Sequence, residues 1–150
     1  LLEEGAVELP EGEFNAAFNP EAVVKVTDVL LASHENTAQI IDARPAARFN
    51  AEVDEPRPGL RRGHIPGALN VPWTELAREG ELKTTDELDA IFFGRGVSYD
   101  KPIIVSCGSG VTAAVVLLAL ATLDVPNVKL YDGAWSEWGA RADLPVEPVK

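Results

Sequence analysis

Short apolar runs alternate along this chain with longer segments that are polar on at least one side. Residues 39–42 and 103–106 are short and rich in β-branched residues, which favours buried strands, and residues 127–131 form a further short segment that we expect to be a strand. Residues 85–92 place their apolar positions on one side of a helix, whereas residues 111–123 are apolar almost throughout, which favours a helix buried on most sides. Strands and helices in alternation predict an α/β domain with a central parallel sheet.

Weaker signals predict the remaining elements, but the order of the strands in the sheet does not follow from the sequence. A proline or glycine bounds several of these segments, and Thr27 is a suitable helix cap. The segments are a short strand over residues 23–26, a helix over residues 27–32, a helical turn over residues 46–49, a strand over residues 68–71 and a short helix over residues 132–141.

The first part of the chain has a different composition from the rest. Residues 1–22 contain glycine, proline and excess glutamate without any helix or strand period, so we expect a linker-like arm followed by one domain over residues 23–150. The first thirteen residues hold five glutamates and no basic residue, which is unlike a secretory leader. Because methionine is absent throughout, we expect this to be a piece of a longer protein.

Composition and charge exclude several classes of function. The chain has 150 residues, of which 46% are hydrophobic and 25% charged, which is typical of a globular domain. A net charge of −11 makes nucleic acid a poor partner, and the longest apolar run is too short for a membrane span of ~20 residues. The single cysteine excludes an internal disulfide and a cysteine-based zinc site, and a free thiol favours a cytoplasmic location.

The single cysteine, Cys107, lies between a predicted strand and a predicted helix. In α/β sheets ligands bind at the carboxyl ends of strands, and the N–H groups of a helix start or a glycine loop stabilise an anion. The following Gly108-Ser109-Gly110 run carries no bulk that could bury the sulfur. We therefore predict a reactive thiolate, and the alternative is a small buried core residue.

Basic residues are concentrated in one part of this acidic chain. Five of the thirteen fall between positions 44 and 62. Such a local positive patch indicates a binding site for a small anion, and the alternative is a set of solvated surface arginines. The five residues are Arg44, Arg48, Arg57, Arg61 and Arg62.

Four motifs in this order resemble the rhodanese-like sulfurtransferases. They are Asp42-Ala-Arg44, Gly63-His-Ile-Pro-Gly-Ala-Leu-Asn70, Cys107-Gly-Ser-Gly-Val-Thr-Ala113 and Tyr131-Asp-Gly-Ala-Trp-Ser-Glu-Trp138. Over roughly residues 14–145 the chain is most similar to the catalytic C-terminal half of two-domain members. The resemblance implies a three-layer α/β/α domain with a central parallel sheet, and an N-terminal rhodanese domain that would precede it.

The resemblance also assigns roles to residues. The run from Cys107 to Thr112 is similar to the loop of members that use 3-mercaptopyruvate, and Arg48 and Arg57 match the arginines that bind the substrate carboxylate. This fits the chemistry, because thiosulfate is a compact dianion whereas 3-mercaptopyruvate carries its carboxylate some distance from its sulfur. Cys107 would be the nucleophile, assisted by Ser109. Substrate contacts are expected from Gly108, Gly110, Val111 and Thr112, and structural support from Asp42, Arg44 and His64.

The implied activity is transfer of a sulfane sulfur from 3-mercaptopyruvate or thiosulfate, through a Cys107 persulfide, to cyanide or a thiol acceptor such as thioredoxin. No metal or organic cofactor is expected, because the sulfur itself carries the covalent chemistry. A phosphatase of the dual-specificity type would need an arginine at the end of the loop, where Ala113 and Ala114 stand. The alternative that stays open is a non-catalytic rhodanese module that binds or regulates. The chain also departs from the family at Ala134, where a serine is usual.

Overall fold

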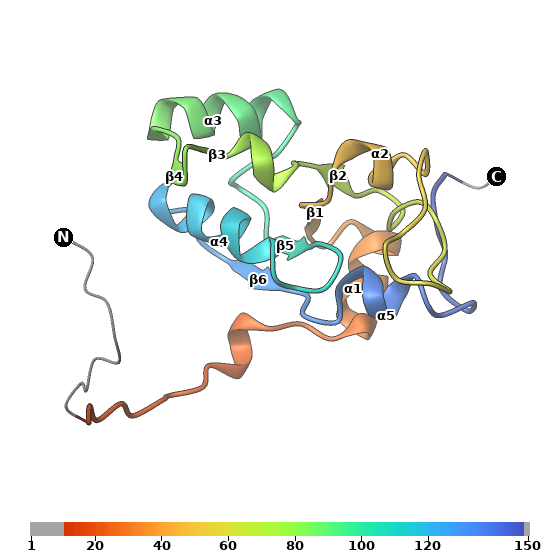
Figure 1. Ribbon diagram of the computed structural model, residues 1–150, viewed down its shortest axis with the longest axis horizontal. Helices are drawn as coiled ribbons and strands as arrows, with labels where there is room; N and C mark the ends of the chain where they lie inside the picture. The colour runs from red at the N-terminus through yellow and green to blue at the C-terminus, as the bar shows by residue number, and fades with distance from the viewer. Residues whose placement is uncertain (1–10, 149–150) are drawn as a thin grey trace, which may run out of the picture.

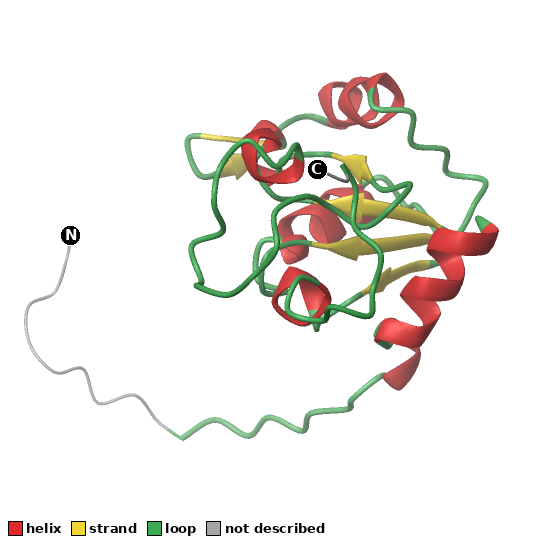
Figure 2. Ribbon diagram, turned by 90° about the vertical axis from the view of Figure 1, so that its right-hand side faces the viewer, coloured by secondary structure: helices red, strands yellow, loops and turns green. Residues whose placement is uncertain are grey.

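A four-stranded parallel sheet forms the centre of the computed structural model, which describes residues 11–148 (Figures 1 and 2). The strand order is β2-β1-β5-β6. β1 and β5 run in register from Gln39 opposite Ile103 to Asp42 opposite Ser106, so their carboxyl ends meet at one edge of the sheet. The strands are β1 (Gln39–Asp42), β2 (Leu69–Asn70), β5 (Ile103–Ser106) and β6 (Val128–Leu130).

Successive residues of the central strands serve two separate cores, one on each face of the sheet. Ile41, Ile103 and Val105 pack into a cluster with side chains of α3 (Thr85–Gly94) and α4 (Ala113–Thr122). Ile40 and Ile104 point to the other face and join a cluster with α1 (Val26–Glu35) and α5 (Ala134–Trp138). The alternation follows from the two-residue period of a strand, and it confirms the predicted three-layer α/β/α arrangement (Figure 1).

Several predicted elements match the structure closely. The strands over 39–42 and 103–106 and the turn over 46–49, which is α2 (Ala46–Phe49), are confirmed with the same bounds. The helix predicted over 85–92 extends to Gly94, and Thr84 caps its start by accepting from the Glu87 amide. The predicted strands over 68–71 and 127–131 are each shorter by one residue at both ends.

The predicted strand over residues 23–26 is wrong. Val23 makes one isolated parallel bridge to Leu130, and α1 already begins at Val26, one residue before the predicted cap. The Asp28 carboxylate accepts a hydrogen bond from the Lys25 amide at 2.8 Å, which satisfies a free N–H at the helix start. The helix therefore begins closer to the N-terminus than predicted. The helix also continues to Glu35, beyond the predicted end at residue 32.

A small antiparallel hairpin was not predicted. It pairs β3 (Ala77–Arg78) with β4 (Glu81–Leu82) directly after the 3₁₀ helix η2 (Trp73–Glu75). Strands of two residues carry too few positions to show a period, so the sequence pattern gives no signal for them.

The predicted arm lies partly outside the described residues, since residues 1–10 are not among them. Residues 11–19 form no helix or strand, and the 3₁₀ helix η1 (Pro20–Ala22) follows. Between residues 11 and 148, no helix combines the length and apolar character needed to cross a membrane. Within the same residues, no three histidine, cysteine, aspartate or glutamate side chains are grouped so that they could hold a metal ion. The domain boundary at residue 23 stays a prediction.

Two leucines on α4 allow a test of the core that supports the site. Leu120 is fully buried against the sheet, whereas Leu118 is 58% exposed. We expect Leu120→Ala to lower the free energy of unfolding by about 2–5 kcal/mol, because a buried leucine leaves a cavity. Leu118→Ala should change it by less than about 0.5 kcal/mol. Urea denaturation measures both, and equal losses would contradict the assigned faces of α4.

Candidate active site

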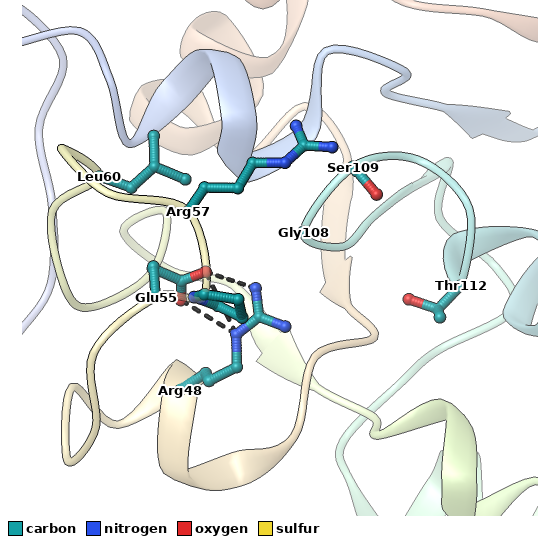
Figure 3. A pocket seen from close by; sticks show the side chains of 8 residues that line it. Arg48, Glu55, Arg57, Leu60, Gly108, Ser109 and Thr112 are labelled. Carbon is teal, nitrogen blue, oxygen red and sulfur yellow. Dashed lines mark hydrogen bonds and ion pairs between the residues drawn. The ribbon is translucent and has the colours of Figure 1, made fainter.

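The candidate site lies where the order of the strands reverses. From β1 the chain continues to β2 on one side, and from β5 it continues to β6 on the other, so the loops that follow β1 and β5 diverge at the same edge. A crevice at such a point is the usual ligand site of an open α/β sheet. It contains a pocket of about 190 Å³ (Figure 3). The pocket is lined by Arg48, Glu55, Pro56, Arg57, Leu60, Gly108, Ser109 and Thr112.

Cys107 directly follows β5, as the sequence predicts, but it is only 1% exposed. The expectation that the small loop residues leave the sulfur unburied is wrong. Cys107 belongs to the buried core cluster that also includes Ala43, which follows β1, and Ala113, the first residue of α4. Gly108 and Ser109, the next two residues, line the pocket.

The loop that follows Cys107 turns its carbonyl groups toward α5. The Cys107 and Gly108 carbonyl oxygens accept hydrogen bonds from the amides of Trp135 (2.9 Å) and Ser136 (3.0 Å). In a trans peptide the N–H points opposite to the C=O, so the next amides face the other way. Among residues 11–148 nothing accepts a hydrogen bond from the amides of residues 108–111. This supports the predicted anion-binding cradle.

The helix after the loop starts later than predicted, and this gives the loop its shape. α4 begins at Ala113, not at residue 111. Gly110 has φ +84°, and a Cβ there would lie 2.8 Å from the Asp132 carboxylate, so glycine is required for both reasons. A Cβ at Gly108 would come 2.8 Å from the Arg48 guanidinium. The two glycines therefore allow the loop to approach Asp132 and Arg48 closely.

The two arginines predicted to bind substrate both line the pocket (Figure 3), and each has a different hydrogen-bond partner. The Nε of Arg48 lies 3.2 Å from both carboxylate oxygens of Glu55, and its Nη2 also pairs with that carboxylate. Arg57 is exposed and donates from Nη1 to the Ser136 hydroxyl at 2.7 Å. Glu55 and Ser136 were not predicted as site residues, because the resemblance assigned no role to either, although Ser136 stands in the Tyr131–Trp138 motif.

Behind Arg48, a buried network connects the pocket to β1. The Arg44 side chain is fully buried and pairs with Asp42 at 2.6 Å and with Glu55 at 2.8 Å. Its guanidinium also donates to the Gly63 carbonyl and lies 4.3 Å from the centre of a Trp135 ring. Glu55 is thus shared between Arg44 and Arg48. This geometry supports the predicted bracing role of Asp42 and Arg44.

His64 lies outside the pocket and packs on α2. Its ring stacks on Phe49 at 3.7 Å with an interplanar angle of 5°. Its Nδ1 lies 2.8 Å from the Phe49 carbonyl, and because a carbonyl only accepts, Nδ1 carries the proton. Since Phe49 follows Arg48, His64 is placed to support the segment that carries this arginine.

The predicted basic patch divides into separate roles. Arg61 is not in the pocket: its guanidinium donates to the carbonyls of Trp138, Gly139 and Leu144, and desolvation lowers the pKa of Arg61. Arg62 forms a surface pair with Asp54. The anion site therefore involves only two of the five arginines as lining residues.

Several buried polar contacts fix α5 beside the loop. Trp135 and Trp138 are buried, and their indole N–H groups donate to the carbonyls of Arg61 and Pro145. The Tyr131 hydroxyl donates to Glu137 at 2.8 Å, and burial followed by this contact raises the pKa of Tyr131, which keeps the phenol protonated. α5 is thereby a rigid support for the loop carbonyls.

Comparison with known proteins agrees with this architecture. Residues 25–141 match the model of the rhodanese-like domain family. The chain is 99% identical over 150 residues to 3-mercaptopyruvate sulfurtransferase of Escherichia coli strain K12, covering all of this chain and 53% of that relative. It is 41% identical over 131 residues to the rat 3-mercaptopyruvate sulfurtransferase, covering 87% and 44%. The chain thus spans about half the length of the curated relatives that it matches.

Solved structures show the same fold. The crystal structure of SseA from Escherichia coli, described as a rhodanese fold, superimposes with a TM-score of 0.78 at 96% identity, covering 91% of this chain and 51% of that one. Tum1 from Saccharomyces cerevisiae gives a TM-score of 0.76 at 28% identity, covering 85% and 46%. The sequence motifs, the three-layer fold and these matches agree, and the chain belongs to the family of rhodanese-like domains.

Proposed function

We propose that this domain transfers a sulfane sulfur from 3-mercaptopyruvate, through a persulfide on Cys107, to a thiol acceptor. The observation that carries the proposal is a pocket in which two arginines face the loop that follows the only cysteine. Guanidinium groups bind carboxylates through paired hydrogen bonds, and the donor carries a carboxylate at the end remote from its sulfur. Relatives that are 99% and 41% identical to this chain are named 3-mercaptopyruvate sulfurtransferase.

In the first half-reaction the Cys107 thiolate attacks the sulfur of the donor. An S–S bond forms, the C–S bond breaks, and its electron pair stays on the carbon as the enolate of pyruvate. The carbon then gains the proton that the donor thiol gives up, and the Ser109 hydroxyl in the pocket is suited to relay it. Arg48 and Arg57 hold the carboxylate, which aims the reacting sulfur at Cys107.

In the second half-reaction an acceptor thiolate or cyanide attacks the outer sulfur and regenerates the Cys107 thiolate. The amides of residues 108–111 are free to donate to the negatively charged sulfur of the persulfide. Thiosulfate is a second possible donor, and thioredoxin is a possible thiol acceptor. The scheme moves only sulfur and protons. A cytoplasmic location stays a prediction, which rests on the free cysteine.

The test is the intact mass of the protein after incubation with 3-mercaptopyruvate or thiosulfate without acceptor. We expect one added sulfur atom, which cyanide removes, because the persulfide is a stable covalent intermediate. 3-Mercaptopyruvate should load the protein at a lower concentration than thiosulfate. No added sulfur from either donor would overturn the proposal.

A non-catalytic binding module is the second candidate, and two observations favour it. Cys107 is 1% exposed, and the chain spans about half the length of its curated relatives. A module of this kind would bind a carboxylate in the pocket yet gain no sulfur. The mass measurement therefore separates the two candidates.

The donor preference should depend on the two pocket arginines. We expect Arg48→Ala and Arg57→Ala each to lower kcat/KM for 3-mercaptopyruvate by about 10- to 100-fold, because each removes a charge-assisted hydrogen bond worth roughly 1.5–3 kcal/mol. The loss with thiosulfate should be smaller. Steady-state kinetics with both donors measures the ratio, and Arg62→Ala, outside the pocket, is the control. Equal losses with both donors would mean that the arginines support the fold instead.

A further inference from the structure

We infer that Ser136 is a positioning residue that connects the substrate arginine Arg57 to the cysteine loop. Its hydroxyl lies 2.7 Å from Nη1 of Arg57 and 2.6 Å from the Gly108 carbonyl oxygen. Arg57 and Ser136 are 79 positions apart in the chain, and the contact brings the β1–β2 segment together with α5. The inference deepens the proposed function and rests on it for its substrate.

The chemistry of the three groups permits one hydrogen-bond direction. A guanidinium only donates and a carbonyl only accepts, so the hydroxyl must accept from Arg57 and donate to Gly108. The Ser136 hydroxyl cannot donate to the guanidinium or accept from the carbonyl, so the two directions cannot be exchanged. The two consecutive hydrogen bonds, from Arg57 to Ser136 and from Ser136 to Gly108, therefore both point away from the guanidinium charge.

On the loop side, Ser136 fixes a peptide plane with two contacts. The Gly108 carbonyl accepts from the Ser136 hydroxyl at 2.6 Å and from the Ser136 amide at 3.0 Å. Because the peptide is planar and trans, its other end, the Ser109 N–H, is directed away from α5. Ser136 thereby orients one amide of the predicted anion cradle.

On the arginine side, Ser136 limits the freedom of an exposed side chain. Arg57 is exposed, and within residues 11–148 Ser136 is the only residue with which its side chain forms a hydrogen bond or ion pair. An arginine side chain loses rotamer freedom when it binds a ligand, and this entropic cost is smaller when the side chain is already held in place. Ser136 sits on α5, which buried Trp135 and Trp138 hold in place, so it anchors Arg57 beside the pocket. The remaining guanidinium N–H groups stay available for a carboxylate.

Alkylation of Cys107 tests this without requiring sulfur transfer. Iodoacetate carries a carboxylate and iodoacetamide does not, and the chain offers both reagents the same single cysteine. The ratio of their rates, followed by intact mass, reports carboxylate positioning and cancels effects on access to the sulfur. We expect Ser136→Ala to lower this ratio about fivefold, because it removes one hydrogen bond and a fivefold change corresponds to ~1 kcal/mol. Ser136→Thr, which keeps the hydroxyl, should restore most of it.

Two controls separate this role from a structural one. Ser33→Ala removes a similar hydroxyl contact, to the Pro66 carbonyl at 2.8 Å, but lies outside the pocket and should leave the ratio unchanged. In an Arg57→Ala background, Ser136→Ala should no longer lower the ratio, because the two residues act through one contact. An unchanged ratio in Ser136→Ala, or the same loss with and without Arg57, would overturn the inference.

The remaining outcomes of the experiment distinguish the positioning role of Ser136 from the proposed function. If Cys107 reacts with neither reagent in the folded protein, the pocket does not lead to the sulfur and the inference fails. A lowered ratio in a protein that gains no sulfur from any donor would leave the positioning role standing and remove the proposed function. Sulfur uptake by the wild-type protein together with an unchanged alkylation ratio in Ser136→Ala would support the proposed function and overturn the positioning role.

Discussion

Cys107→Ser is expected to abolish sulfur uptake from every donor and to lower kcat by more than about a thousandfold, because a hydroxyl is a far weaker nucleophile and cannot form the persulfide. Intact mass after incubation with 3-mercaptopyruvate should show no added sulfur, whereas the wild-type protein gains one atom. Cys107 is the only cysteine, so no second thiol can supply a background.

The fold of this variant needs its own measurement, because Cys107 lies in the core cluster. Circular dichroism and urea denaturation should show the native fold with a modest loss of stability, since the exchange alters one buried atom. A folded Cys107→Ser protein that still moves sulfur at the wild-type rate would refute the covalent mechanism.

Arg44→Met is expected to lower the free energy of unfolding by about 3–5 kcal/mol. The variant leaves the buried carboxylates of Asp42 and Glu55 without their shared cation, and breaking a buried pair by removing one partner is far more costly than losing a surface pair. Methionine keeps much of the side-chain volume, so the effect reports charge more than packing. Urea denaturation measures the loss.

The matched control is Arg62→Met. Arg62 pairs with Asp54 at the surface, where the two side chains are 43% and 82% exposed, so we expect a change below about 1 kcal/mol. Similar losses in both variants would contradict the view that the Arg44 network holds the loop in place. Arg44→Met should also weaken use of 3-mercaptopyruvate, because Glu55 holds both Arg44 and Arg48.

The elements that sequence predicted best are those whose own composition decides them. Residues 39–42 and 103–106 are buried strands whose apolar side chains reach both cores, and their bounds were predicted without error. By contrast, the strand predicted over 23–26 failed because Val26 is used as the first residue of α1, a choice made by the Asp28 cap. β-branched residues alone do not decide between these outcomes.

The sequence predicted those residues of the candidate site to which the family resemblance assigns a role. Cys107, Arg48 and Arg57 stand in recognisable runs, and the structure places the two arginines and the cysteine loop around one crevice. Cys107 shares a buried core cluster with Ala43, which is distant in sequence, and the hydrogen-bond partner of Arg57 is Ser136 on another element. Contacts of this kind arise from the tertiary fold, so a pattern read along the chain carries no signal for them.

The way α5 holds the cysteine loop bears on how this family can evolve. The loop is fixed through the carbonyls of Cys107 and Gly108, not through its side chains, and Ser109 and Val111 are exposed. Exchange of those two side chains should therefore leave the backbone geometry around the sulfur intact. We expect selection from a library randomised at these two positions to yield altered donor preferences at little cost in stability, so that new specificities become accessible through few mutations.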